Sequence, residues 1–389
     1  MSRSYKIIIA SLVVIILALL VYAIWFRNSG TPVTPPEQTP VTGMLPLPVE
    51  NTTSTEVLSP GTGGATNAVE QKFVKLSDKP VFDYWVNTGT LEAYYLTADG
   101  VVYLAKEADD TEVSSQPLTA LNSLEPNSKG DRALVAFGNP RSLQWGVFDA
   151  VDKIWRPLPS GIITATWGAK DNEIIAITGT SGDARTLGTY DVSKTPPAFK
   201  AILQDFRLGD VRLTLVPPTS LYITELPSPS YQSRAWLFDT KTLAVNTLQR
   251  GGNDLVLRMS QDRTKTFLGS ASQFQIFTGL MLTSIFPTPF KTVPQKCASL
   301  GSTIACFVPQ NAESVPQDSD LIDAYLTNKT YFNDALYLMN TAADSMQQIS
   351  VSDLNNSKPV DAKNPRITGN YLYFINKLDN GLYRLTTGQ

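Results

Sequence analysis

The sequence contains no histidine and only two cysteines among its 389 residues. Without an imidazole, the chain itself cannot supply a Ser-His or Cys-His catalytic pair, a His-ligated metal site or a His haem ligand. Two cysteines are too few for a zinc ribbon, an iron-sulfur site or a disulfide-rich scaffold. The 32 Lys and Arg against 35 Asp and Glu give a net charge of -3, so nucleic acid is not an expected partner.

Short motifs for catalysis and cofactor binding are also missing. The sequence has no Gly-x-x-x-x-Gly-Lys phosphate loop, no Gly-x-Gly-x-x-Gly fingerprint, no Gly-x-Ser-x-Gly elbow and no Ser-x-x-Lys pair. We therefore expect no cofactor and no metal, and we assign no catalytic residue. Chemistry based on a pair of carboxylates stays open, because the sequence does not show which acidic side chains converge.

A long uncharged run stands at the start of the chain. No charged residue occurs from Ile7 to Phe26, and a helix of that length spans roughly 30 Å, the thickness of a bilayer's hydrocarbon core. Tyr22 and Trp25 stand where aromatic rings favour the headgroup zone. A cleaved signal peptide is the alternative, but the run is long and ends without a small-x-small site. Residues 1–27 are thus predicted to be a short stub and a transmembrane anchor.

Positive charge flanks this run unequally. Arg3 and Lys6 precede it, and Arg27 alone follows before a long stretch without Lys or Arg. Because positive residues stay on the cytoplasmic side, the N-terminus should be cytoplasmic and the rest extracytoplasmic. The lipid bilayer, as the plasma or inner membrane, is therefore the first expected partner.

The segment 28–69 resembles a spacer in its composition. Thr, Pro and Gly dominate it, and residues 28–68 include no Lys, Arg or aromatic residue. Such a stretch cannot bury enough apolar surface to offset the entropy of ordering it. We expect a disordered linker, and a Pro-rich peptide ligand is the alternative.

Residues 70–389 carry a β-rich repeat. Short apolar strands follow polar turns, as in the hairpins around Asn127, Lys170, Asp262 and Gly369, and sustained helical periodicity is missing. Most of these units start about 40 to 50 residues apart, the length of a four-stranded propeller blade. Blade starts are predicted near residues 81, 121, 162, 211, 254, 295 and 363. The fold class is therefore all-β, a seven-bladed propeller of four-stranded blades; a β-sandwich is the alternative.

The two ends of this domain complement each other. The last unit shows only three strands, predicted over residues 363–367, 371–376 and 381–385. Residues 71–76 form a strand-like segment that belongs to no complete unit. Pairing that segment as the missing outer strand would close the ring and leave only protected edges.

The repeating hairpins resemble those of TolB-like and WD-repeat-like propellers of bacterial envelope proteins. That family has Ser-Pro-Asp-Gly before a β-strand, and the nearest matches here are residues 260–262, Ser-Gln-Asp, and residues 125–127, Glu-Pro-Asn. No unit keeps the full tetrad, which leaves the subfamily open. The resemblance covers residues 71 to 389, and it implies a binding platform without naming a ligand.

The two cysteines fall in one predicted hairpin. If Gly301 and Ser302 form a two-residue turn, Cys297 faces Cys306 with α-carbons about 4.5 to 5.5 Å apart, within disulfide range. A disulfide requires the extracytoplasmic location argued above, since cytosolic thiols stay reduced. Two buried free thiols are the alternative.

The unit with these cysteines has a long insertion, residues 309–333. Within it, residues 320–326 are predicted to form a short helix. Long insertions often bind partners, so Asp320, Tyr325 and Tyr331 are candidate contact residues, with surface decoration as the alternative. A calcium site is disfavoured because the ligand alternation and glycine of a calcium loop are missing.

Five tryptophans of the domain raise a similar choice between binding and packing: they could line a glycan or peptide groove or fill the core between blades. These five are Trp85, Trp145, Trp155, Trp167 and Trp236.

The sequence as a whole favours a non-enzymatic binding or scaffold module that presents a propeller face to a protein or glycan partner. The alternative is an anchored hydrolase or lyase that uses carboxylates, with or without a divalent cation, at the propeller axis.

Overall fold

The computed structural model describes residues 72–107, 109–179, 185–249, 251–279, 281–315 and 320–387. The predicted anchor, Ile7 to Phe26, and the predicted linker, 28–69, lie outside the described residues. Within the described ranges, no helix combines the length and the apolar character needed to cross a bilayer.

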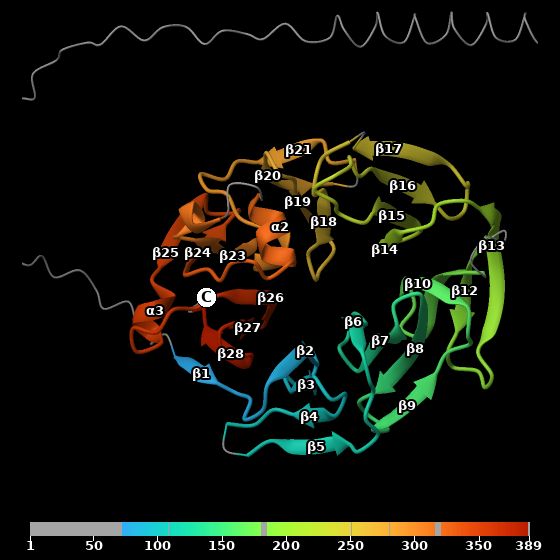
Figure 1. Cartoon of the computed structure of the whole chain (residues 1–389), viewed down its shortest axis with the longest axis horizontal. Helices are drawn as coiled ribbons and strands as arrows, with labels where there is room; N and C mark the ends of the chain where they lie inside the picture. The colour runs from blue at the N-terminus through green and yellow to red at the C-terminus, as the bar shows by residue number, and fades with distance from the viewer. Residues whose placement is uncertain are drawn as a thin grey trace, which may run out of the picture. The chain divides into compact units, whose positions relative to one another are not determined.

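Seven antiparallel sheets of four strands surround a common axis (Figure 1). The inner strands are β2 (Val81–Val86), β6 (Leu121–Pro126), β10 (Ile162–Trp167), β14 (Val211–Val216), β18 (Val256–Met259), β22 (Cys297–Leu300) and β26 (Ala362–Thr368). The second strands are β3 (Ala93–Thr97), β7 (Arg132–Asn139), β11 (Glu173–Thr178), β15 (Ser220–Glu225), β19 (Lys265–Gly269), β23 (Thr303–Pro309) and β27 (Tyr371–Asn376). The third strands are β4 (Val102–Leu104), β8 (Ser142–Asp149), β12 (Arg185–Asp191), β16 (Ala235–Asp239), β20 (Phe274–Thr278), β24 (Asp334–Asn340) and β28 (Gly381–Thr386). The outer strands are β5 (Thr111–Ser114), β9 (Ile154–Pro157), β13 (Ala198–Phe206), β17 (Val245–Gln249), β21 (Ser284–Phe286), β25 (Ser345–Ile349) and β1 (Phe73–Lys75). The prediction of a seven-bladed propeller with four-stranded blades is confirmed.

Four short helical segments of the described ranges lie in and around the sixth blade. They are η1 (Pro294–Lys296), η2 (Ala312–Ser314), α2 (Leu321–Leu326) and α3 (Val351–Leu354). The insertion runs from the end of β23 at Pro309 to the start of β24 at Asp334, as expected, and α2 is the predicted helix. Asp320 caps α2, because its Oδ1 accepts hydrogen bonds from the backbone N–H groups of Ile322 and Asp323 at 2.8 and 2.9 Å.

The polar hairpins set the blade spacing, even where the family tetrad is degenerate. In the fifth blade, Ser260 Oγ accepts hydrogen bonds from the backbone N–H groups of Thr264 and Lys265 at 3.1 and 2.9 Å, and it donates to Asp262 Oδ1 at 2.6 Å. A side chain therefore closes the turn between β18 and β19 without the proline and glycine of the tetrad. The sequence located the blade starts to within two residues, because each inner strand directly precedes such a turn.

The ring closes as the sequence predicts. β1 pairs with β28, the last described strand, with Phe73 opposite Leu385 and Lys75 opposite Tyr383. The Leu76 N–H donates to the Leu382 carbonyl at 2.7 Å, which extends this ladder by one further bond. The first and the last strands of the propeller thus belong to the same sheet, the seventh blade, whose strand order is β1-β28-β27-β26.

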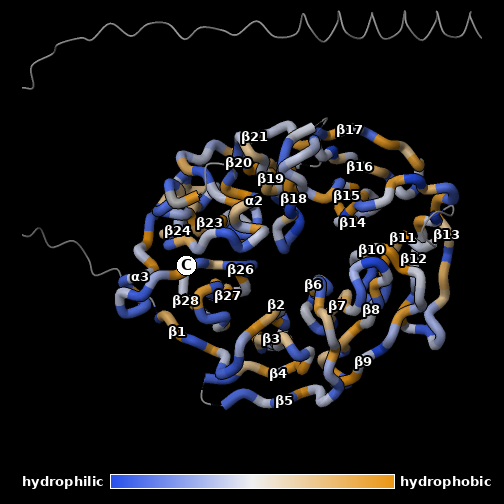
Figure 2. The backbone as a smooth tube through the Cα atoms, viewed as in Figure 1, coloured by the Kyte–Doolittle hydropathy of each residue, from blue (hydrophilic) through white to orange (hydrophobic). Residues whose placement is uncertain are grey.

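Apolar side chains fill each of the seven junctions between neighbouring blades. One cluster joins the first and second blades around Trp85, and another joins the seventh and first blades around Tyr84 and Tyr373. Trp85, Trp145 and Trp167 are buried, which confirms core packing for these three tryptophans. Figure 2 shows hydrophilic segments at the centre of the ring, beside β6, β10 and β18.

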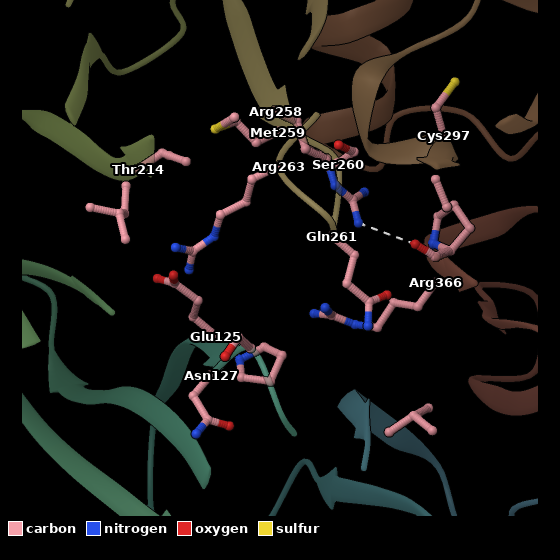
Figure 3. Close-up of a pocket in the computed structure, with 16 residues that line it drawn as sticks. Glu125, Asn127, Thr214, Arg258, Met259, Ser260, Gln261, Arg263, Cys297 and Arg366 are labelled. Atoms are coloured by element: carbon pink, nitrogen blue, oxygen red, sulfur yellow. Dashed lines mark hydrogen bonds between the residues drawn. The ribbon is translucent and has the colours of Figure 1, made fainter. Parts of the chain in front are cut away.

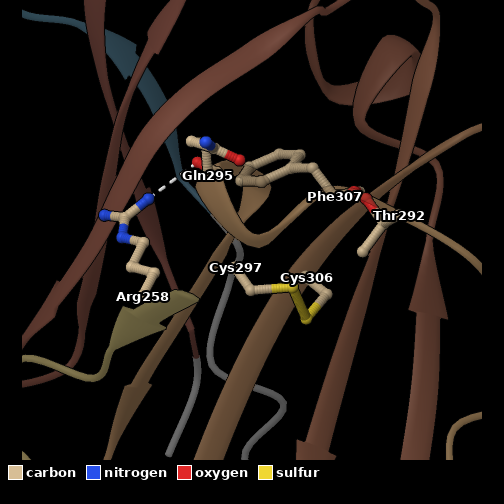
Figure 4. The surroundings of a disulfide bond; sticks show 6 residues. All are labelled: Arg258, Thr292, Gln295, Cys297, Cys306 and Phe307. Carbon is tan, nitrogen blue, oxygen red and sulfur yellow. Dashed lines mark hydrogen bonds between the residues drawn. A yellow bond between two sulfur atoms is a disulfide. The ribbon is translucent and has the colours of Figure 1, made fainter. Parts of the chain in front are cut away.

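The two cysteines form the predicted disulfide (Figure 4). Cys297 pairs with Cys306 and Leu300 with Thr303, so the register across the Gly301–Ser302 turn is the expected one. The α-carbons lie 4.2 Å apart, slightly closer than the distance of about 4.5 Å for such a pair. Both residues are fully buried between the fifth and sixth blades, so the bond is structural.

Replacing both cysteines with alanine is expected to lower the free energy of unfolding by about 2 to 3 kcal/mol, because the disulfide restricts the unfolded chain. Denaturant unfolding of the oxidised protein measures this difference. Reductant should shift the midpoint of the wild type in the same direction and leave that of the double variant unchanged. Equal midpoints for oxidised wild type and double variant would show that the bond contributes no stability.

Candidate functional site

A cavity of about 160 Å³ lies at the axis of the ring, where inner strands and their turns converge (Figure 3). Residues of four blades supply its charged and polar wall. These residues are Glu125, Asn127 and Ser128 of the second blade, Thr214 of the fourth, Arg258, Ser260, Gln261 and Arg263 of the fifth, and Arg366 of the seventh. Val86 and Ala298 add apolar surface from the first and sixth blades. The wall thus contains three guanidinium groups and one carboxylate.

Arg258 extends from β18 to the neighbouring blades. Its Nη1 donates a hydrogen bond to the Gln295 carbonyl at 2.8 Å, and its Nη2 donates to the Pro365 carbonyl at 3.3 Å (Figures 3 and 4). Burial, and after it the positive charge of Arg366, lowers the pKa of Arg258 to about 10. Arg258 therefore holds the Gln295 carbonyl, which precedes β22, and the Pro365 carbonyl, which lies in β26. Its charged side chain also lines the cavity.

Arg366 lies on β26, beyond an irregularity in the pairing between Lys363 and Arg366. Its guanidinium carbon is 5.7 Å from the centre of the Tyr84 ring. Among the described residues its buried Nε has no hydrogen-bond partner. The Tyr84 hydroxyl donates to the Asn364 and Tyr373 carbonyls, both at 2.7 Å, so this ring is a fixed platform beneath the guanidinium. Arg366 thus lines the cavity, and the Nε that has no partner among the described residues is itself buried.

Glu125 is the carboxylate of the cavity. Thr166 donates a hydrogen bond to its Oε1 at 2.8 Å, and burial raises the pKa of Glu125 despite that bond and the charge of Arg263. In Figure 3 the side chains of Arg263 and Glu125 point toward each other. Burial lowers the pKa of Arg212, on β14, and the charge of Glu125 partly offsets this effect. Glu125 therefore balances one positive charge, and a positive excess stays at the axis.

A second carboxylate, Asp83 on β2, lies close enough to Arg258 to act on its pKa. Asp83 is already engaged, because the Asn364 amide donates to both of its oxygens at 3.2 Å and the Tyr84 N–H donates to Oδ1 at 2.9 Å. Across the described ranges, no group of three or more Asp, Glu or Cys side chains is placed to hold a metal ion. The chemistry that this site offers is recognition of an anion by charge and guanidinium hydrogen bonds.

The three candidate contact residues of the insertion occupy different environments. Asp320 is half-buried at the N-terminus of α2. Tyr325 is only 5% exposed and packs with Val256, Val293 and Phe332, so its side chain offers little contact surface. Tyr331 is 55% exposed. A role for the insertion in partner binding stays a prediction, with Tyr331 as its accessible side chain.

Sequence reasoning missed the arginine cluster. Arg258 and Arg366 stand far apart in the chain, within the inner strands β18 and β26, and Arg263 lies in the turn after β18. A charged residue in an inner strand is the available signal, because inner strands of a propeller converge on the axis.

No family model matches the sequence, and neither does any curated protein. The β-propeller domain of Cps50 (Swd1) from Myceliophteria thermophila has a similar fold, with a TM-score of 0.50 and 10% identity over 81% of this chain and 99% of that one. The tricorn protease has a TM-score of 0.50 and 10% identity over 83% of this chain, which spans 34% of the protease chain. TolB from Acinetobacter baumannii has a TM-score of 0.40 and 12% identity over 68% of this chain and 62% of that one. At these identities the similarity shows the propeller fold alone, and the subfamily stays open.

Proposed function

We propose that this chain is a membrane-anchored, extracytoplasmic binding protein whose axial cavity receives an anionic group of its partner. The observation that carries the proposal is the axial wall itself, in which three arginines surround a single carboxylate. The partner is a surface or envelope protein or a glycan that presents a carboxylate or a similar acidic group at the mouth of the ring.

The charges around the cavity support an anionic ligand. Arg366 lowers the pKa of Arg258, so the two guanidinium groups repel each other in the free protein. An incoming anion would relieve this repulsion, and the guanidinium of Arg366 lines the cavity that it would enter. Guanidinium groups bind carboxylates through paired hydrogen bonds, which are stronger than neutral ones. The size of the cavity suits one acidic group rather than a whole drug-sized ligand.

The anchor and the spacer complete the proposal. The uncharged run from Ile7 to Phe26 would hold the chain in the plasma or inner membrane, with the N-terminus in the cytoplasm. The Pro, Thr and Gly-rich segment 28–69 would set the ring at a distance from the bilayer. A rigid ring on a spacer is suited to meeting a partner fixed elsewhere in the envelope.

An anchored hydrolase or lyase is the competing function. One observation favours it: burial raises the pKa of Glu125, which suits a proton donor in a cleft. Hydrolysis by paired carboxylates needs a second acid across the substrate, and Asp83 is held by Asn364 and Tyr84. A Glu125→Gln variant separates the two functions, because it should abolish turnover in an enzyme and preserve or strengthen anion binding in a binding protein.

Replacing Arg366 with glutamine is expected to weaken anion binding about 10- to 100-fold, since a hydrogen bond to a charged group contributes about 1.5 to 3 kcal/mol. Glucuronate and glucose are a matched pair of probes, because they differ mainly in one carboxylate. Calorimetric titration of the detergent-solubilised full chain should detect glucuronate and not glucose. Arg366→Gln is preferred to a change at Arg258, whose guanidinium also binds two carbonyls.

Arg141→Gln is the matched control, because Arg141 is exposed in the turn between β7 and β8 and does not line the cavity. This control should bind glucuronate as the wild type does. Equal binding of glucuronate and glucose, or equal losses in the Arg366 and Arg141 variants, would refute an axial anion site.

A further inference from the structure

A second cluster of charged residues, none of which lines the cavity, lies next to the insertion. Lys296, the last residue of η1, is fully buried together with Asp334 at the start of β24 and Asp361 just before β26. The Lys296 Nζ contacts Asp334 Oδ2 directly and lies 2.6 Å from Asp361 Oδ1. A lysine amine thus meets two carboxyl groups in the interior of the protein, where an ion pair loses its hydration.

Aromatic rings enclose this cluster. The Lys296 Nζ is 5.2 Å from the centre of the Tyr325 ring and 5.4 Å from that of Phe332. Lys377 lies on the other side, with its Nζ 3.9 Å from Asp361 Oδ2 and 4.3 Å from the centre of the Tyr325 ring. The side chains of Lys296, Asp334 and Asp361 have no exposed surface. Bulk water therefore does not compete with the two carboxyl groups for hydrogen bonds to the Lys296 amine.

The two carboxyl groups have different surroundings. Asp334 Oδ2 accepts the Ala362 N–H at 2.8 Å, whereas the buried Oδ1 of Asp334 has no partner among the described residues. Burial raises the pKa of Asp334 to about 6. Asp361 is better satisfied, because its Oδ2 accepts the Phe332 N–H at 3.1 Å and its Oδ1 accepts from Lys296. Asp334 is therefore protonated more easily than an exposed aspartate, and its hydrogen bonds hold the Asp361 carboxylate beside the amine.

We propose that Lys296 and Asp334 condense to an intramolecular isopeptide bond, with Asp361 as the catalytic base. The proposal rests on the juxtaposition of one buried amine, one carboxyl with an unpartnered oxygen and one hydrogen-bonded carboxylate, all shielded by aromatic rings. Nothing in the reaction requires a cofactor or an external reagent.

The reaction balances within these three side chains. The Lys296 ammonium first transfers a proton to Asp334, which gives a neutral amine and a carboxylic acid. The amine attacks Cγ of Asp334, whose oxygen Oδ2 has taken the first proton from the ammonium that it contacts. Asp361, whose Oδ1 lies 2.6 Å from the Lys296 nitrogen, takes a second proton from that nitrogen and passes it to the Oδ2 hydroxyl, which leaves as water. A C–N bond forms, a C–O bond breaks, the third hydrogen stays on the amide and Asp361 ends as it began.

Burial provides the driving force for this step. Leaving an ion pair in an apolar interior carries a desolvation cost of several kcal/mol per ion, whereas the amide product is neutral. The Lys296 amine is already hydrogen-bonded to the Asp334 carboxyl group, so little entropy is lost on reaching the transition state. The bond would link η1 to β24 across a separation of 38 residues and would lie next to the Cys297–Cys306 disulfide. The sixth blade would then be covalently closed at both its hairpin and its insertion.

Intact mass of the reduced, denatured full chain tests the proposal without any variant. We expect a mass about 18 Da below that of the sequence, which corresponds to one lost water. Trypsin should fail to cleave after Lys296, and it should release the peptide 292–329 covalently joined to the peptide 330–363 after reduction. A mass equal to that of the sequence, with normal cleavage after Lys296, would overturn the proposal.

Two variants then assign the roles. Lys296→Arg keeps the positive charge but removes the nucleophilic amine, so it should have the full sequence mass. Asp361→Asn keeps both reacting groups and removes the base, so at least a tenfold smaller fraction of the protein should show the mass loss. A mass loss that persists in Lys296→Arg, or that is undiminished in Asp361→Asn, would contradict the assigned roles. Fragmentation of the joined peptides distinguishes Asp334 from Asp361 as the bonded residue, and a bond to Asp361 would refute the assignment.

Discussion

Deleting residues 72–76 is expected to lower the free energy of unfolding by about 5 kcal/mol or more. The deletion removes β1 and with it the outer strand of the seventh blade. Leu76 is 5% exposed, and burying such a side chain contributes about 1.5 to 3 kcal/mol. Phe73 packs against Tyr383 and Phe374 at 5.0 and 5.9 Å between ring centres. The lost backbone hydrogen bonds add about 0.5 to 1.5 kcal/mol each.

Thermal or denaturant unfolding measures this effect, and hydrogen exchange locates it. The amide protons of β28 should lose protection first, because their partner strand is gone. Deleting residues 51–55 is the matched control, since it shortens the predicted linker by the same number of residues and should leave the midpoint unchanged. If the 72–76 deletion unfolds at the same midpoint as this control, strand β1 does not hold the ring closed.

Substituting Trp85 with alanine is expected to cost about 3 to 5 kcal/mol of stability, the usual range for a large aromatic residue in a core. Trp85 on β2 is fully buried, stacks on Tyr94 at 5.5 Å and meets the edge of Phe148 at 5.9 Å. Phe148 belongs to the second blade, so the substitution opens a junction between blades. Denaturant unfolding gives the difference directly.

Trp85→Phe is the informative partner of this variant. Within the described part of the chain the Trp85 Nε1 has no hydrogen-bond partner, so phenylalanine loses packing volume and no hydrogen bond. Its cost should therefore be well below that of the alanine variant. Equal costs for both variants would mean that the indole nitrogen, rather than apolar packing, accounts for the contribution of Trp85.

The architecture could be predicted because its determinants are local. Each blade has a polar turn followed by a strand, such as Glu173–Thr178 or Tyr371–Asn376. The bounds predicted for the second of these strands, 371–376, match the structure. The disulfide could be predicted for the same reason, since a two-residue turn at Gly301 and Ser302 fixes the register of Cys297 and Cys306.

The sites could not be predicted in this way, because their residues come from separate blades. Glu125, Arg258 and Arg366 line one cavity only when the ring closes, because they come from β6, β18 and β26. For a different reason, the burial of Tyr325 could not be predicted either. Its place in a long insertion indicated an exposed contact residue, yet helix α2 directs it inward against Phe332 and Lys296. The sequence pattern of one short helix does not reveal which face the neighbouring blades cover.

Photo-cross-linking in cells tests most directly the claim that the mouth of the ring meets an anionic partner. A photoreactive residue at Ser128, in the exposed turn between β6 and β7 at the cavity, is compared with one at Arg141, in the turn at the opposite end of β7. The account predicts one specific partner, captured from position 128 and not from 141, whose yield falls in an Arg366→Gln background. Equal capture from both positions, or capture at position 128 that is insensitive to Arg366, would contradict it.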